Sequence, residues 1–528
     1  MTTRQRWTMV AAILGSATVF LDGTVVNVAL QKIGEELPAS VIGVLEGQTY
    51  ATSGYLATLA ALLILAGALA DYYGRRRVFS IGLAGFGIAS VLCGIAPDLE
   101  LFVLFRIIQG AAGALLVPCS LSIITATFEG PQRARAFGIW AAATSATTLA
   151  GPILSGLLVD YVTWRAAFLI NVPILAVALW ATRAHMDESR DEQASGRFDW
   201  LGAADVVLAV GGLAFGGIRG EQTAWSDPVA FVALGIGVVA FVAFPILMTR
   251  RHDPLVPLGL FRSRDFTAIN LSTFLIYAAL YLSSSYQPLY LQGVLGYAPW
   301  AAGAVGLPIA IALTLLSTRI GTLAGRYGAR PFLVVGPVLM AAGQLWLARI
   351  PSTSEAWKTE LIPPAATFVD VLPSMILFAI GISCVVAPLT STLMNSVPVR
   401  NSGVASAINN AVSRVGQPLL GAVIFIVITS SFYASMATRL PNVDVSRPEF
   451  RRDVTPLNPP KGAPAPEVVR ASADASTESF HLAMITTAVL LVAGGAVNWI
   501  GLGGATRVPG RSGRADRAEG PEPSAPGG

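Results

Sequence analysis

Long apolar runs alternate with short polar connections along almost the whole chain. We count about fourteen runs of roughly 17–25 residues, each long enough to cross a ~30 Å hydrocarbon layer as a helix. Their centres fall near Ser16, Leu59, Gly87, Gly113, Thr147, Val177, Val210, Ala240, Tyr277, Ala312, Val335, Gly381, Ile424 and Leu490. Barrel strands are excluded, because they are shorter and alternate polar with apolar positions. The pattern therefore predicts an all-α integral membrane protein with about fourteen spans.

The composition and the placement of charge agree with this prediction. Only 12% of the 528 residues are charged, whereas soluble proteins carry about 25%. With fourteen spans, both chain ends share one side of the membrane. The loops and tails on that side carry about twice as many Arg and Lys residues as those on the other, so both termini are expected in the cytoplasm.

Three connections are longer than the rest. Residues 183–200 form a charged loop, and residues 507–528 read as a disordered tail, both on the cytoplasmic side. Residues 434–479 are Pro-rich and are expected to form an exposed outer loop, with a small folded lid as the alternative. The predicted division is a first bundle over 1–182, a loop with two extra spans and a linker over 183–265, and a second bundle over 266–506.

The chain contains an internal repeat. GALADYYGRR, from Gly67 to Arg76, closes the second predicted span, and GTLAGRYGAR, from Gly321 to Arg330, closes the tenth. Both copies fall at cytoplasmic turns between helices. Repeated halves that meet around a site at the membrane midplane are a common transporter design, so the repeat favours a transporter.

The first copy of the repeat has two interpretations. Gly67 allows two helices to approach closely, and Asp71 is placed to cap the following helix. Gly74 suits a tight turn, and Arg75 and Arg76 hold that turn in the cytoplasm. In the alternative interpretation these residues form a charge latch that opens when the two halves rock.

Asp22 is the only ionisable residue in the apolar run from Trp7 to Leu30. A carboxylate in hydrocarbon costs several kcal/mol unless it is paired, hydrated or protonated. Helical rise places Asp22 and Arg106 at a similar depth, roughly 20 Å from the cytoplasmic surface. We expect the two to pair and to take part in proton coupling, although a static structural ion pair explains the pattern too.

The fifth predicted span carries a stripe of small residues. Ala143, Thr147, Gly151 and Ser155 recur every four residues, and Pro152 permits a bend. The stripe lies within the segment from Gly138 to Gly156. It predicts either ordinary close packing or a tight, dry seam between the two halves.

The ninth predicted span carries aromatic residues on one face. Phe274, Tyr277 and Tyr281 are spaced i, i+3 and i+7. They are candidates for the lining of an amphipathic cavity, with Asn409 on the thirteenth span. Packing in the protein core is the alternative explanation.

Several classes of function are excluded or unsupported. The sequence has no phosphate-binding loop and no sizeable soluble domain that binds ATP. Its three cysteines and three histidines form no ligand cluster, so we expect no metal site. We expect no catalytic residue and no cofactor. The small net charge of +4 gives no indication of a nucleic-acid partner. An ion gradient remains as the energy source.

These motifs together resemble the fourteen-span drug:proton antiporters of the major facilitator superfamily. The resemblance rests on LDGTVVNVAL, GALADYYGRRR, RIIQGAAGA, the Gly138–Gly156 segment, WRAAFLINVP and SGVASAINNAVSRVG. Gln31 and Tyr50 depart from the family pattern, as do Thr147 and Ser155. In the family the arginine of the fourth-span motif is implicated in proton transfer, and here it is Arg106.

The resemblance implies two pseudo-symmetric six-helix bundles with two extra helices at their periphery. It implies an exporter of small amphipathic compounds in a bacterial cytoplasmic membrane, driven by protons. We expect the protein to be a monomer. Asn27, in the first-span motif, joins the candidate cavity residues. Two alternatives stay open: a dedicated exporter of one natural product or lipid, and a membrane sensor or scaffold that transports nothing.

Overall fold

The computed structural model describes residues 1–38, 44–190, 198–222, 226–251, 254–358, 362–460 and 464–503, and those residues are helical with no strand. The first half contains α1 (Thr3–Glu36), α2 (Val44–Tyr73), α3 (Arg75–Gly94), α4 (Leu99–Ala114), α5 (Leu116–Thr127), α6 (Gly130–Tyr161), α7 (Ala166–Leu169) and α8 (Asn171–His185). Next come α9 (Trp200–Gln222), α10 (Pro228–Thr249) and the short 3₁₀ helix η1 (Leu258–Arg262).

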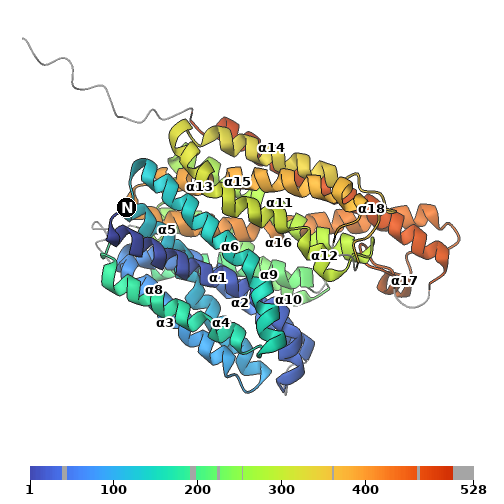
Figure 1. Cartoon of the computed structure of the whole chain (residues 1–528), viewed down its shortest axis with the longest axis horizontal. Coiled ribbons are helices and arrows are strands. Elements are labelled where there is room, and N and C mark those ends of the chain that lie inside the picture. The colour runs from blue at the N-terminus through green and yellow to red at the C-terminus, as the bar shows by residue number, and fades with distance from the viewer. Residues whose placement is uncertain are drawn as a thin grey trace, which may run out of the picture.

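The second half contains α11 (Arg264–Gly293), α12 (Pro299–Ala304), α13 (Leu307–Tyr327), α14 (Arg330–Leu347), the π-helical turn η2 (Thr367–Val371), α15 (Leu372–Asn395), η3 (Val399–Asn401), α16 (Ser402–Arg439), α17 (Pro448–Asp453) and α18 (Pro466–Gly501). The two halves form two bundles lying side by side, one running from blue to cyan and the other from yellow to red (Figure 1). Together they confirm the predicted all-α fold.

Twelve helical segments of the described chain are long and apolar enough to cross a membrane. They include neither α1 nor α6, which are 34 and 32 residues long and lie on two other predicted spans. Each of the fourteen predicted centres thus falls on a helix. The count of fourteen spans stays a prediction, because only twelve segments meet the criteria of length and composition.

Of the two extra helices, α9 packs against both bundles and α10 packs against α9. Helix α9 contacts α10, and it also contacts α2 of the first bundle and α16 of the second. A β-carbon on Gly211 of α9 would lie 2.9 Å from that of Ala61 on α2. Helix α10 exposes most of its apolar surface. Only α10 is therefore peripheral, whereas α9 covers the line where the two bundles meet.

The fourth predicted span is broken at Leu115, where α4 ends and α5 begins. Pro118 lies near the start of α5. Because proline lacks an N–H and its ring clashes with the carbonyl group four residues earlier, it disrupts the helix at Ala114. The α-helical hydrogen bond is replaced there by a tighter one from the Leu115 N–H to the Ala112 carbonyl.

The described residues of the 434–479 segment are folded, which fits the alternative of a small lid better than the expected exposed loop. Helices α16 and α18 extend into residues 434–479, and α17 lies between them. A separate buried cluster contains Phe432, Met436, Leu440, Val454, Ala471 and Ala475. Arg439 of α16 pairs with Asp474 and Glu478 of α18 at 3.2 and 2.6 Å. These contacts explain the projection at the end far from the N-terminus in Figure 1.

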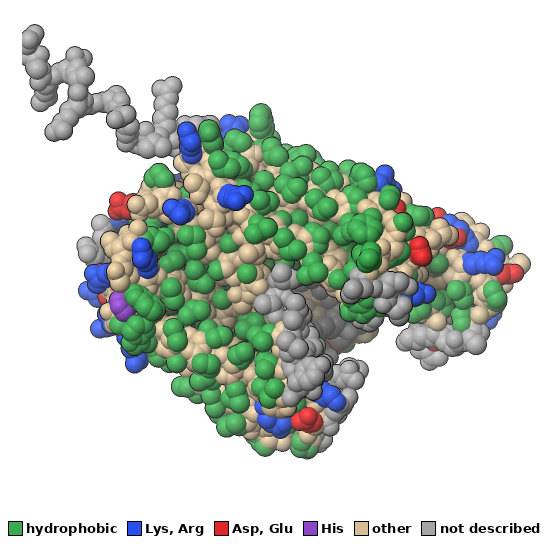
Figure 2. Space-filling view, in the orientation of Figure 1, with side chains coloured by type: hydrophobic (Ala, Val, Ile, Leu, Met, Phe, Trp, Pro, Cys, Tyr) green, Lys and Arg blue, Asp and Glu red, His purple; other side chains and the backbone are tan. Residues whose placement is uncertain are grey.

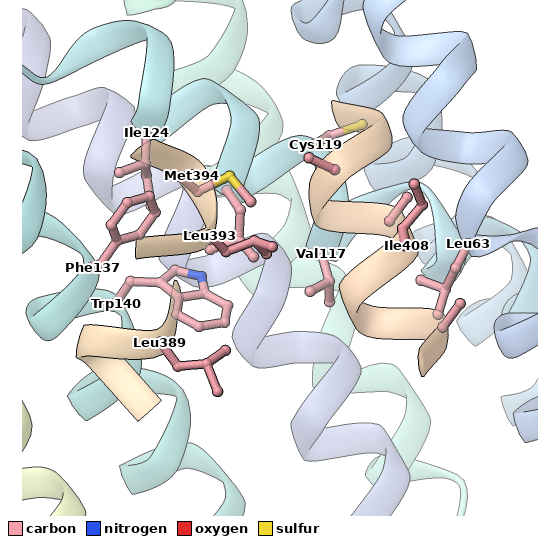
Figure 3. Packing of buried hydrophobic residues seen from close by; sticks show 14 of the residues in the cluster. Leu63, Val117, Cys119, Ile124, Phe137, Trp140, Leu389, Leu393, Met394 and Ile408 are labelled. Atoms are coloured by element: carbon pink, nitrogen blue, oxygen red, sulfur yellow. The ribbon is translucent and has the colours of Figure 1, made fainter. Parts of the chain in front are cut away.

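The bundles meet at the end of the molecule that carries the N-terminus, which we call the N-terminal end. One buried cluster there joins both bundles, and Figure 3 shows Phe137 and Trp140 of α6 opposite Leu389, Leu393 and Met394 of α15. In Figure 2 the surface is hollowed between the bundles at the opposite end. The two halves are thus closed against each other at the N-terminal end.

Candidate functional site

Asp22 and Arg106 form a fully buried ion pair. Arg106 Nη1 donates to Asp22 Oδ2 at 2.6 Å, and each side chain is 1% exposed. Asp22 lies in α1, and Arg106 lies in α4. The pairing expected from their depths is present. A buried carboxylate is tolerated in such a place only when it is paired or protonated.

The arginine of this pair has other partners on α2. Its guanidinium lies 4.1 Å from the centre of the Tyr55 ring, and Nε donates to the Ala51 carbonyl at 3.4 Å. The Tyr55 hydroxyl in turn donates to the Val19 carbonyl of α1 at 3.4 Å. Helices α1, α2 and α4 are therefore joined around Arg106. A positive charge over an aromatic face is stabilised most where water is excluded.

Gln109 completes the cluster, and sequence reasoning did not assign it a role. Its Nε2 donates to Asp22 Oδ1 at 3.0 Å and to the Ser90 hydroxyl at 2.9 Å, while its Oε1 accepts from Arg106 at 2.6 Å. Gln109 follows Arg106 by three residues, so both side chains share one face of α4. That spacing within RIIQG was the signal that could have identified it.

A second buried ion pair links the two bundles at the N-terminal end. Asp71 Oδ1 accepts from Arg75 Nη2 at 2.8 Å and from the Gly403 N–H at 3.1 Å. Asp71 Oδ2 accepts from the Val404 N–H at 2.9 Å. Arg75 donates across the same interface to the Val399 carbonyl at 2.5 Å. We call Asp71, Arg75 and these backbone groups the latch.

The latch corrects the expectation that Asp71 caps the helix after its own turn. Asp71 lies inside α2 and caps α16, whose N-cap Asn401 forms no side-chain capping bond. The first N–H groups of a helix have no partner within it and favour a negative charge. Glu188 caps α3 instead, accepting from the Arg76 and Arg77 N–H groups at 3.0 and 3.2 Å.

The glycines of the repeat have two different roles. A β-carbon on Gly67 would collide with the Gly403 carbonyl and would lie 2.5 Å from the Ala407 β-carbon, so the close approach expected at Gly67 is confirmed. Gly74 and its counterpart Gly328 have φ of 109° and 90°. These angles favour glycine. The two turns of the internal repeat thus share a backbone conformation.

The predicted seam between the two halves is a close contact of α6 with α13 at Gly138, which lies among the described residues. A β-carbon on Gly138 would lie 2.9 Å from the Ser317 carbonyl oxygen and from the Thr318 Cα, both on α13 of the other bundle. Thr147 donates to the Ala143 carbonyl at 2.9 Å, within its own helix, and Gly151 is buried. The side chains of Pro152 and Ser155, and Gly156, lie outside the described residues.

Replacing Gly138 by valine is expected to open this seam. Overpacking costs about 1–3 kcal/mol, which lowers the population closed at the N-terminal end by about 5–150-fold. Spin labels at Arg135 and Arg326 would report a longer distance by electron paramagnetic resonance. Gly235→Val is the matched control, because nothing lies within 4 Å of a β-carbon there. An unchanged distance in Gly138→Val would contradict the seam.

The candidate cavity residues lie on α11 and α16. The rings of Tyr277 and Tyr281 are 6.1 Å apart, and Phe274, Tyr277 and Tyr281 are all partly exposed. Asn409 donates to Asn270 and Thr273 of α11 at 3.2 and 2.9 Å, so it joins α16 to α11 within one bundle. The side chain of Asn27 lies outside the described residues. A substrate-binding role for these residues stays a prediction.

Comparison with known proteins identifies relatives along most of the chain. A family model described as Major Facilitator Superfamily matches residues 12–421. Multidrug resistance protein Stp of Mycobacterium tuberculosis is 33% identical over 442 residues, which cover 83% of this chain and 78% of that protein. The tetracenomycin C resistance and export protein of Streptomyces glaucescens is 32% identical and covers 80% and 76%.

A solved structure supports the architecture independently. The human organic anion transporter MFSD10 superposes with a TM-score of 0.58 and 15% sequence identity. The superposition covers 93% of this chain and 100% of that one. At this identity the likeness concerns the fold alone, and it extends over both bundles.

Proposed function

Because this chain belongs to the Major Facilitator Superfamily, a superfamily of membrane transporters, we propose that it exports small amphipathic compounds, including drugs, in exchange for protons. Its relatives are named for multidrug resistance and for antibiotic export. The single observation that supports proton exchange is the buried Asp22–Arg106 pair. We place the protein in a bacterial cytoplasmic membrane as a monomer, with both termini in the cytoplasm and no cofactor.

In this orientation the described conformation faces outward, because the bundles are closed at the N-terminal end. The outer medium is the acidic side of an energised bacterial membrane. Asp22 gains a proton there, loses its attraction to Arg106, and the site releases its substrate. After the latch opens, the proton leaves to the cytoplasm, and the ionised pair forms again as substrate binds.

Competition between proton and substrate for one site gives obligatory exchange. A carboxylate that alternates between pairing with an arginine, as in the described conformation, and carrying a proton can exchange one for the other during the cycle. The movement of protons down their gradient then drives the movement of substrate out of the cell. A cationic substrate would compete with the proton for Asp22 directly.

Flux measurements in proteoliposomes test the proposed function. Purified protein would be reconstituted with a pH-sensitive dye inside, and a panel of amphipathic cations, zwitterions and neutral compounds would be added. We expect some of these compounds to drive a proton flux opposite to their own movement. Binding of a compound without any flux of that compound or of protons would favour a sensor or scaffold instead.

Replacing Arg106 by alanine is expected to abolish coupled transport and to remove its dependence on pH. Without the guanidinium, the buried Asp22 has no opposite charge and takes up a proton permanently. Exchange of labelled for unlabelled substrate, measured from pH 5.5 to 8.5, would be flat with pH. A wild-type pH profile in this variant would mean that the ion pair is only structural.

A dedicated exporter of one natural product is the second candidate. One relative is named for resistance to a single compound, tetracenomycin C, and for its export. A narrow substrate range in the flux panel, together with neighbouring genes for the synthesis of one compound, would favour this candidate over a multidrug exporter.

A further inference from the structure

Two arginines of the second bundle converge on the carboxyl end of α18, at the N-terminal end of the molecule. Arg264, at the start of α11, donates from Nη2 to the Ile500 carbonyl at 2.5 Å. Arg330, at the start of α14, donates from Nη2 to the Trp499 carbonyl at 2.6 Å. Because these carbonyls belong to successive residues, the two guanidinium groups are neighbours. The mechanism above uses neither of them.

The first bundle has the same arrangement at the end of α8. Arg4, near the start of α1, donates to the His185 carbonyl at 3.2 Å. Arg76, near the start of α3, donates to the Arg183 carbonyl at 2.9 Å. Arg76 and Arg330 occupy the same position of the internal repeat. Two arginines at the end of the last long helix are therefore a feature of both halves.

The first bundle supplies negative charge to its pair of arginines from its own chain. Asp187 and Glu188 follow directly after α8. Asp187 forms an ion pair with Arg4. Glu188 accepts from the Arg76 N–H at 3.0 Å. Both cations of the first bundle thus have a carboxylate beside them.

The second bundle supplies no such carboxylate within the part of the chain that the structure describes. Neither Arg264 nor Arg330 forms an ion pair with a described residue. Asp265, the nearest carboxylate along the chain, accepts from the Gly503 N–H at 3.2 Å instead. The Nε atom of Arg330 is buried and has no hydrogen-bond partner among the described residues.

The helix end alone does not balance the two cations. The carboxyl end of a helix carries about half a negative charge, which a single arginine already complements. A second guanidinium beside the first adds repulsion between like charges. From Leu502 onward the sequence carries three arginines before its first acidic residue, Asp516. The excess of positive charge at the end of α18 therefore favours an anion from outside the chain.

The surface around the two arginines is apolar. Trp499 and Ile500 are 61% and 68% exposed, and the Arg330 guanidinium lies 4.9 Å from the centre of the Trp499 ring. Tryptophan and arginine side chains are typical of the membrane surface. In Figure 2 the surface over α14 is largely hydrophobic, with Lys and Arg side chains towards the N-terminal end. Further exposed apolar residues lie along α14 and α18: Val335, Val338, Val489 and Val492.

We propose that Arg264 and Arg330 bind the phosphodiester group of an anionic phospholipid, whose acyl chains lie on the apolar surface of α14 and α18. Guanidinium groups donate to phosphate oxygens in pairs. A free phosphate would balance the charge without using the exposed apolar surface, so we assign the site to a lipid. Because Asp187 is already present in the first bundle, we expect one such site in the molecule. The proposal does not depend on the direction or coupling of transport.

Native mass spectrometry of the full-length protein in detergent micelles tests this site. The protein would be titrated with phosphatidylglycerol or with phosphatidylcholine that has the same acyl chains. We expect the first phosphatidylglycerol to bind at least about tenfold more tightly than the first phosphatidylcholine. This preference should disappear in Arg264→Gln and in Arg330→Gln, because glutamine keeps an N–H donor and loses the charge.

Two control variants remove a cation elsewhere on the same end of the molecule. Arg326→Gln removes an arginine from the last turn of α13 in the second bundle, and Arg4→Gln removes the first-bundle counterpart of Arg264. Both should keep the wild-type preference. An equal loss of preference in Arg326→Gln would mean that positive charge in general attracts the lipid, and it would overturn the site.

The remaining outcomes are equally decisive. Each glutamine variant tests the site separately, so one folded variant is sufficient. An unchanged preference for phosphatidylglycerol in Arg264→Gln or Arg330→Gln would overturn the proposal. Equal binding of the two lipids by the wild-type protein would do so too. Glycerophosphoglycerol, the soluble headgroup without acyl chains, should bind far more weakly than the intact lipid. If it bound as tightly, the ligand would be a soluble phosphate ester and the assignment to a lipid would be wrong.

Discussion

Replacing Asp22 by asparagine is expected to abolish proton-driven export while the protein stays folded. The amide cannot carry a proton through the cycle. Arg106 keeps a hydrogen bond to Gln109 at 2.6 Å and its contact with the Tyr55 ring at 4.1 Å. These contacts reduce the cost of leaving a buried cation without its carboxylate, which is otherwise about 3–5 kcal/mol.

Two flux measurements separate coupling from binding in this variant. With an imposed pH gradient, export by Asp22→Asn should fall to the level of protein-free liposomes. Exchange of labelled for unlabelled substrate needs no proton and should persist unless the substrate is a cation held by Asp22 itself. Asp444→Asn, which removes an exposed carboxylate outside the predicted spans, is the control. Full proton-driven export in Asp22→Asn would refute the assignment.

The Asp22–Arg106 pair could be predicted because both its members carry a strong sequence signal. Each is an ionisable residue within an apolar run, and helical rise fixes its depth. Gln109 was harder to predict, because an amide in a helix is common and its role depends on the rotation of α4. The geometry shows that it holds the carboxylate and the guanidinium together.

The partners of Asp71 in the second bundle could not be predicted from the sequence. They are the backbone N–H groups of Gly403 and Val404, more than 330 residues away. Almost every residue carries a backbone N–H, so the sequence does not mark which of these groups Asp71 binds. The sequence therefore predicted that Asp71 caps the nearest helix, α3. The folding of the 434–479 segment was given only as the alternative, for a related reason. Its prolines are evident, whereas the cluster around Phe432 and Met436 forms only when α16 and α18 pair.

Replacing Asp71 by asparagine is expected to slow the conformational change more than it weakens substrate binding. The carboxylate accepts from Arg75 and from two N–H groups at the start of α16. The amide loses the negative charge and presents a donor to one of these N–H groups. A loss of about 3 kcal/mol would reduce the closed population by roughly 150-fold. The Kd of a transported compound for one given conformation should change by less than about threefold, because Asp71 has its described bonds with Arg75 and α16 and none with the Asp22–Arg106 pair.

If the latch holds the bundles together, Asp71→Asn should change the distance between the bundles and the transport rate without abolishing substrate binding. Distances between spin labels at Arg135 and Arg326 should lengthen in Asp71→Asn, and the maximal transport rate should fall. Glu188→Gln is the matched control, because Glu188 caps α3 beside the latch without contacting the second bundle in the described contacts. It should leave the distances unchanged. A variant of Asp71 that lost substrate binding but kept wild-type distances would place this carboxylate in the binding site. Because Asp71 bonds directly to the N-terminus of α16, we expect longer spin-label distances and a lower maximal transport rate in Asp71→Asn.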